Sequence, residues 1–163
     1  MSSGAVTAGA EGRVRYQVAI DTAALVGAQG LLSFQFNPAA IPGSPNAEAR
    51  ITGLRLSGGV AGARTIDGDV SQFSSSQFTL RPSAVLNRLI ESVTLGARIE
   101  FDLELVGPGL SAPDFSDFSD MFALQLLSAD GSRSLLAADV SASILRVNLA
   151  SDGTTKARSS GAA

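Results

Sequence analysis

The chain has 163 residues, contains neither cysteine nor histidine, and carries a formal net charge of −3 at pH 7. The missing residue types exclude disulfides, thiolate and imidazole metal ligands, and the commonest nucleophiles and general bases near neutral pH. The twelve basic residues are scattered, and one Tyr with no Trp offers little for base stacking, so we expect no nucleic-acid partner. No apolar run approaches the roughly 20 residues of a membrane span.

The two ends of the chain differ in composition from its middle. Residues 1–12 and 151–163 are rich in Gly, Ser and Ala, which predicts flexible tails. Between them, strand-sized segments are separated by Gly, Pro, Asn and Asp. The sequence therefore predicts one domain of ordinary size over residues 13–150.

The first half of this domain contains several segments with strand periodicity. Residues 13–21 and 31–38 alternate apolar and polar side chains, which is the pattern of half-buried strands. Residues 22–30 (TAALVGAQG) predict a loop or a single helical turn between them. In residues 47–59 the inward parity changes across Gly53, and such a change predicts a β-bulge.

The second half continues the pattern with one ambiguous segment. Residues 83–96 suit either two helical turns or a strand, whereas residues 98–107 (RIEFDLELVG) alternate strictly. A hairpin-like turn at 129–134 (ADGSRS) follows a strand, and residues 144–150 predict the last strand. The sequence therefore predicts an all-β fold: an antiparallel two-sheet β-sandwich, jelly-roll or immunoglobulin-like, with about eight strands and at most one short helix.

Three carboxylates, Glu100, Asp102 and Glu104, form the polar side of the strictly alternating segment. Side chains two residues apart on a strand are about 6.5–7 Å apart at the backbone, near the carboxylate spacing of an inverting glycosidase. Such acids also suit a hard cation. We favour a solvated sheet face, because Arg13 and Arg15 lie on the polar side of the first strand and would form cross-strand ion pairs. This interpretation predicts that at least one of the three acids meets an arginine.

Calcium is the metal that the composition suggests, because the available ligands are hard oxygens. The candidate ligands are Asp67 and Asp69, in a DGD sequence, and Asp114, Asp117 and Asp120, in DFSDFSD. Asp-Gly is also a common turn signal. We predict no catalytic residue and no cofactor, with a structural Ca²⁺ at one of these loops as the alternative.

The order of several segments is similar to that of a known family. These segments are YQVAIDTAALVGAQGLLSFQFNP (16–38), GDV (68–70), VTLGARIEFDLEL (93–105), and FALQLLSADGSRSLLAAD through ILRVNLASDG (122–153). They resemble the ectodomain of exported bacterial proteins that the PEP-CTERM/exosortase system sorts. The resemblance implies a small β-rich domain at the surface or in the matrix of Gram-negative bacteria, with no catalytic residues assigned. Members also carry a signal peptide and end in a Pro-Glu-Pro motif, a hydrophobic helix and a basic cluster, which the 163 residues do not contain.

The residues and the resemblance together predict a non-enzymatic module, extracellular or at the cell surface, with a structural, adhesive or self-assembly role. Its expected partners are copies of itself or surface polysaccharide. A calcium-assisted carbohydrate-binding module is the alternative, and a glycan hydrolase that uses the acidic strand is a third hypothesis. A concave pocket over the three acids would favour the hydrolase, and arginines paired with them would favour the structural module.

Overall fold

The computed structural model describes residues 2–8, 13–37, 47–107, 121–136, 143–149 and 155–159. Within these residues lie twelve strands and one short 3-10 helix, η1 (Ala23–Leu25). The strands are β1 (Ser2–Ala8), β2 (Arg13–Asp21), β3 (Gln29–Asn37), β4 (Glu48–Ser57), β5 (Val60–Asp67), β6 (Val70–Ser74), β7 (Gln77–Leu80), β8 (Arg88–Thr94), β9 (Arg98–Val106), β10 (Met121–Ser128), β11 (Ser143–Leu149) and β12 (Thr155–Ser159). None of the described elements is an apolar helix long enough to span a membrane.

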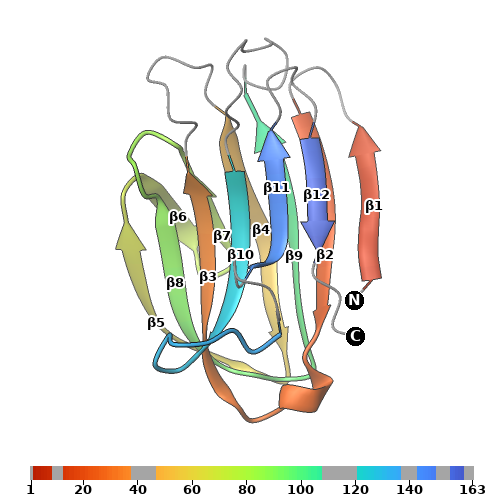
Figure 1. Ribbon diagram of the computed structural model, residues 1–163, viewed down its shortest axis with the longest axis vertical. Coiled ribbons are helices and arrows are strands. Elements are labelled where there is room, and N and C mark those ends of the chain that lie inside the picture. The colour runs from red at the N-terminus through yellow and green to blue at the C-terminus, as the bar shows by residue number, and fades with distance from the viewer. Residues whose placement is uncertain are drawn as a thin grey trace.

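The strands form two six-stranded sheets that face each other (Figure 1). Sheet A has the order β1-β2-β9-β4-β7-β6, and sheet B has the order β12-β11-β10-β3-β8-β5. All ladders between these strands are antiparallel. The terminal strands β1 and β12 are edge strands at one side of the sandwich, and β5 and β6 are edge strands at the other (Figure 1). The predicted all-β sandwich is confirmed.

The pairing of strands that are distant in sequence distinguishes the two predicted types of sandwich. β2 pairs with β9, β3 with β8, and β4 with β7, so the pairs are nested around the β5–β6 connection. A long two-stranded ribbon that is rolled up produces this nesting, which is the organisation of a jelly roll. The strands β10, β11 and β12 then extend sheet B beyond β3.

The core fills the space between the inner faces of the two sheets. Its largest fully buried side chains are Phe34, Phe36, Phe78, Phe122, Leu32, Ile51, Leu80, Leu89, Leu95, Ile99, Leu103 and Leu105. Phe34 of sheet B meets the rings of Phe78 and Phe101 of sheet A edge-to-face, with centroids 5.0 and 5.4 Å apart. These aromatic contacts join the two sheets at the centre of the core.

The bulge expected at Gly53 is present in β4. The register between β4 and β9 shifts between Thr52 and Arg55, and Gly53 has a φ of +66°. Glycine adopts this left-handed conformation without a steric penalty, which explains the residue at this position. The shift changes which side chains of β4 face the core, as the sequence predicts.

The ambiguous segment 83–96 contains strand β8 and no helix among its described residues. Asn87, which is fully buried, organises the loop before this strand. Its amide donates to the carbonyls of Phe36 (3.1 Å) and Ala84 (2.8 Å), and its Oδ1 accepts from the Asp69 backbone N–H (2.9 Å). These hydrogen bonds hold the loop as a turn and outweigh the local helical pattern.

The two predicted tails and the predicted number of strands need correction. Residues 2–8, within the tail expected at 1–12, pair with β2, and residues 155–159, within the tail expected at 151–163, pair with β11. A sheet ladder joins backbone groups, so segments of small polar residues can take part despite their weak side-chain pattern. These two edge strands are among the reasons why twelve strands, and not about eight, lie within the described residues.

Candidate functional site

The acidic strand β9 lies in the interior of sheet A, between β2 and β4. In the register of the sheet, Glu104 lies between Arg15 of β2 and Arg50 of β4, and Glu100 lies between Ala19 of β2 and Arg55 of β4. The expected antiparallel pairing of the first strand with the acidic strand is therefore confirmed. The alternate residues of β9 are buried in the core, so its acidic side forms the outer face of sheet A.

Each of the three acids on β9 forms an ion pair with an arginine from a neighbouring strand. Arg15 Nη2 lies 2.5 Å from Asp102 Oδ2, and Arg55 Nη2 lies 2.6 Å from Glu100 Oε2. Arg13 Nε is 3.5 Å from Glu104 Oε1. The prediction that at least one acid meets an arginine is confirmed for all three.

These ion pairs extend into a continuous chain across the outer face of sheet A. Arg50 bridges Glu104 (3.6 Å) and Glu48 (3.1 Å). Arg81 then bridges Glu48 (3.0 Å) and Asp69 (3.5 Å). Alternating charges therefore run from β9 to the edge of the sheet at β6, and the face carries matched charges of both signs. We call this surface the ion-paired face.

The pKa directions on the ion-paired face favour the charged forms. The hydrogen bond from Arg55 lowers the pKa of Glu100, and the hydrogen bond to Asp102 raises the pKa of Arg15. The hydrogen bond to Glu48 likewise raises the pKa of Arg81. A glycosidase general acid needs a raised carboxyl pKa, and the pKa of Glu100 moves in the opposite direction.

A hollow of about 380 Å³ lies on the same face above the centre of β9. Its polar lining includes Gln17, Thr52, Arg55, Glu100 and Asp102. Gly53 forms part of its wall, and a Cβ added there would meet nothing within 4 Å. The hollow can accept a polar group, but the two carboxylates that line it already form ion pairs with arginines.

The calcium candidates at 67–69 are bound to other side chains. Arg88 donates to Asp67 Oδ2 from Nε (3.1 Å) and Nη2 (2.7 Å), and Ser83 Oγ donates to Asp69 Oδ2 (2.7 Å). The described residues contain no group of three or more acidic side chains that could hold a metal ion.

The other calcium candidates, Asp114, Asp117 and Asp120, lie outside the described residues.

Asp130 closes the turn that follows β10. Its Oδ1 accepts from Ser128 Oγ (2.5 Å), the Ser132 backbone N–H (3.0 Å) and Ser132 Oγ (2.8 Å), which lowers its pKa from 3.8 to about 2. The stabilising effect of the ionised form is therefore present above pH 3.8 and is lost as the pH falls towards 2. We expect an NMR titration of the Asp130 carboxyl to give a pKa near 2.

The matched variant for this titration is Ser128→Ala, which removes the largest of these contributions. It should move the pKa of Asp130 back towards 3.8. A pKa close to 3.8 in the unsubstituted protein would contradict the described turn.

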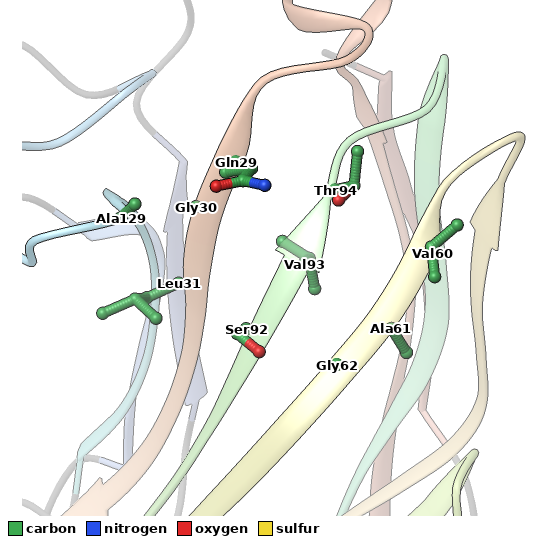
Figure 2. A pocket seen from close by; sticks show the side chains of 10 residues that line it. All are labelled: Gln29, Gly30, Leu31, Val60, Ala61, Gly62, Ser92, Val93, Thr94 and Ala129. Atoms are coloured by element: carbon green, nitrogen blue, oxygen red, sulfur yellow. The ribbon is translucent and has the colours of Figure 1, made fainter.

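A second hollow, of about 240 Å³, lies at sheet B over β3, β8 and β5 (Figure 2). Gln29, Ser92 and Thr94 supply its side-chain polar groups, and the rest of its lining is apolar or glycine: Gly30, Leu31, Val60, Ala61, Gly62, Val93 and Ala129. This lining offers hydrogen bonds and apolar contact, and it contains no titratable side chain for acid–base chemistry.

Sequence reasoning did not identify the buried ion pair between Glu91 of β8 and Arg64 of β5. Arg64 Nε donates to Glu91 Oε1 at 3.0 Å, and the two side chains are 12% and 3% exposed. The same guanidinium donates to the carbonyls of Ser74, the last residue of β6, and of Ser75 in the turn that follows, and it lies over the ring of Phe78. The pair therefore joins sheet B to sheet A at the β5–β6 side. The sequence does contain a signal for this burial: Glu91 lies between Leu89 and Val93 in the alternation of β8, so it occupies a position that faces the core.

No family model matches the chain, and no curated protein or solved structure matches it either.

Proposed function

We propose that the chain is a non-enzymatic structural module that joins copies of itself through the edge strand β5, at the bacterial cell surface or in its matrix. The observation that carries the proposal is the character of residues 60–63. All four are exposed and none is charged. Edge strands of monomeric proteins usually carry charges or proline that prevent pairing with another chain.

The backbone of β5 also has groups to offer a partner. The register between β5 and β8 shifts between Ala61 and Arg64, so Gly62 and Ala63 both lie opposite Ser92. This bulge affects the ladder with β8, whereas the other edge of β5, which ends sheet B, pairs with no described strand and can accept an added strand.

The ion-paired face makes the broad surface of sheet A a poor contact surface, which favours contact through the edge strands. Its charges are matched in pairs, and separating or desolvating them would cost free energy. The pairing of all three β9 acids and the lowered pKa of Glu100 argue against general acid catalysis there. The surface or matrix location follows from the resemblance to exported proteins.

We expect a charge on β5 to weaken self-association. In Val60→Lys, a strand-to-strand contact would bury the new ammonium group and bring the ammonium groups of two copies close together. Both effects oppose the contact, so self-association should weaken roughly tenfold or more. Sedimentation velocity over a concentration series measures the effect.

The matched control is Val26→Lys, because Val26 is 62% exposed and Val60 is 65% exposed, while Val26 lies beside η1 and not on an edge strand. Val26→Lys should associate like the unsubstituted protein. Equal weakening by both variants, or a monomer at every concentration tested, would contradict the proposal.

A further inference from the structure

One row of side chains across sheet A supplies hydrogen-bonding groups to the hollow of about 380 Å³ above β9. In the register of the sheet, Asp102 lies between Gln17 of β2 and Thr52 of β4, and all three residues line the hollow. The row therefore brings an amide, a carboxylate and a hydroxyl together on three neighbouring strands. Directly opposed side chains lie about 4.5–5.5 Å apart at Cβ, so a small ligand can bridge adjacent members of the row.

The neighbouring row of the same face provides the space of the hollow. In this row Glu100 lies between Ala19 of β2 and Arg55 of β4. Ala19 adds only a methyl group to the lining, and Gly53 in the bulge of β4 adds no side chain at all. The hollow is accessible from solvent, because it lies on the outer face of the sheet and the Arg55 side chain beside it is 68% exposed.

Several polar atoms around the hollow have hydrogen-bonding capacity left. Neither the Gln17 amide nor the Thr52 hydroxyl forms a hydrogen bond within the part of the chain that the structure describes. The arginine partner of Asp102 binds Oδ2, and Oδ1 has no partner among the described residues. Arg55 binds Glu100 through Nε and Nη2, which leaves its Nη1 for another acceptor. The hollow therefore offers both donors and acceptors while its ion pairs stay intact.

The charges around the hollow favour an uncharged ligand. Each of its two carboxylates already has an arginine partner, so a cation would find no unpaired negative charge there. An anion would be repelled by the same carboxylates and would have to compete with them for the arginines. A carboxylate accepts hydrogen bonds, a guanidinium donates them, and an amide does both, so hydroxyl groups complement this mixed set.

Sugars carry hydroxyl groups of this kind on adjacent carbon atoms, and they have the right size. Small-ligand sites usually measure roughly 300–1,000 Å³, and the volume of about 380 Å³ lies within this range. The hollow of sheet B is smaller, at about 240 Å³, and has no charged group to strengthen a hydrogen bond.

We infer that the hollow on sheet A binds a neutral sugar through its hydroxyl groups. One sugar hydroxyl donates to Oδ1 of Asp102, and neighbouring hydroxyls exchange hydrogen bonds with the Gln17 amide and the Thr52 hydroxyl. The sugar takes the place of water at these groups and leaves the ion pairs unbroken, which avoids the cost of separating buried or half-buried charges. The site lies on the opposite sheet from β5, so binding does not depend on assembly.

The first test applies the whole chain to an array of neutral gluco-, manno-, galacto- and xylo-oligosaccharides, with polygalacturonate as the acidic probe and chitosan as the basic probe. The protein should bind at least one neutral oligosaccharide and neither charged probe. Binding should persist at high salt, because no net charge is neutralised. Binding to a charged probe alone, or to no neutral oligosaccharide of the array, would overturn the inference.

The second test measures the affinity of variants for the neutral oligosaccharide that binds best, by isothermal titration calorimetry. Gln17→Ala removes one hydrogen-bonding group and should weaken binding roughly five- to tenfold. The matched control is Gln29→Ala, which removes another exposed amide, at the hollow of sheet B. Gln29→Ala should bind like the unsubstituted protein, and equal weakening by both variants would contradict the site.

Ala19→Leu fills the hollow and removes no hydrogen-bonding group. It should weaken sugar binding by tenfold or more, because the larger side chain occupies the space of the ligand. Its melting temperature should stay close to that of the unsubstituted protein, since residue 19 lies on the outer face of the sheet. Unchanged sugar binding by Ala19→Leu would place the sugar elsewhere and overturn the inference.

A further comparison separates sugar binding from assembly. Val60→Lys, on the other sheet, should bind the sugar with unchanged affinity, and Gln17→Ala should self-associate like the unsubstituted protein. Sugar binding by a protein that stays monomeric would support the sugar site and contradict assembly through β5. Loss of sugar binding in Val60→Lys would contradict the placement of the sugar on sheet A.

Discussion

Replacing Arg64 with alanine is expected to lower the free energy of unfolding by about 3–5 kcal/mol, because it leaves the charge of Glu91 buried without its partner. The Glu91 side chain is only 3% exposed. Its Oε1 accepts from Arg64, and its Oε2 has no hydrogen-bond partner within the described residues. The ion pair with Arg64 is therefore its main compensation for burial. A loss of this size is a large fraction of the stability of a typical domain.

Arg64 also supports the turn between β6 and β7. Its guanidinium donates to the carbonyls of Ser74 (3.3 Å) and Ser75, and its Cζ lies 5.5 Å from the centroid of the Phe78 ring. Alanine would remove these contacts between the sheets as well as the ion pair. Urea denaturation monitored by circular dichroism measures the loss.

Two further variants make this prediction specific. Arg55→Ala removes an arginine whose ion pair with Glu100 is short but exposed, and it should cost much less than Arg64→Ala. The double variant Arg64→Met/Glu91→Leu replaces both buried charges with apolar side chains and should recover most of the lost stability. If Arg64→Ala costs no more than Arg55→Ala, the buried pair does not have the role described.

Phe34→Ala is expected to destabilise the protein by about 3–5 kcal/mol through loss of buried apolar surface and the cavity left behind. Phe34 is fully buried, and its edge-to-face contacts with Phe78 and Phe101 connect the two sheets. Such contacts add about 0.5–1.5 kcal/mol each beyond area burial. Urea denaturation again provides the measurement.

The matched control for Phe34→Ala is Phe73→Ala on β6, where the ring is 64% exposed. It should change stability by no more than about 0.5 kcal/mol. Phe34→Leu keeps most of the volume and should lie between the two. Comparable losses for Phe34→Ala and Phe73→Ala would contradict the described core.

The sequence was most informative in segments that match the strand periodicity and no other secondary-structure pattern. The strict alternation of β9 predicts which side is buried, and Arg13 and Arg15 on the polar side of β2 predict the cross-strand ion pairs. Gly53 predicts the bulge, because few other residues adopt its conformation without strain. Each of these predictions starts from a local pattern of side chains, and the ion pairs also require β2 and β9 to be neighbours in the sheet.

Other features depended on contacts that are distant in the sequence. Asn87 fixes the loop before β8 through hydrogen bonds to Phe36 and Asp69, so local propensity could not decide between helix and strand. The burial of Glu91 depends on Arg64 from another strand. The pairing of the terminal segments depends on free sheet edges, which their composition does not reveal.

The same reasoning explains the aspartates at 67–69. A short DGD sequence suits both a turn and a cation site. The arginine and serine partners that bind Asp67 and Asp69 come from residues 81–88, beyond the reach of a local motif.

Hydrogen exchange measured at low and at high protein concentration tests the proposed assembly through β5 most directly. If copies pair along this edge, amide protection at residues 60–63 should increase with concentration in the unsubstituted protein and in Val26→Lys, and not in Val60→Lys. Exchange at residues 60–63 that is independent of concentration while the protein associates would contradict assembly through β5, and so would a protein that stays monomeric throughout.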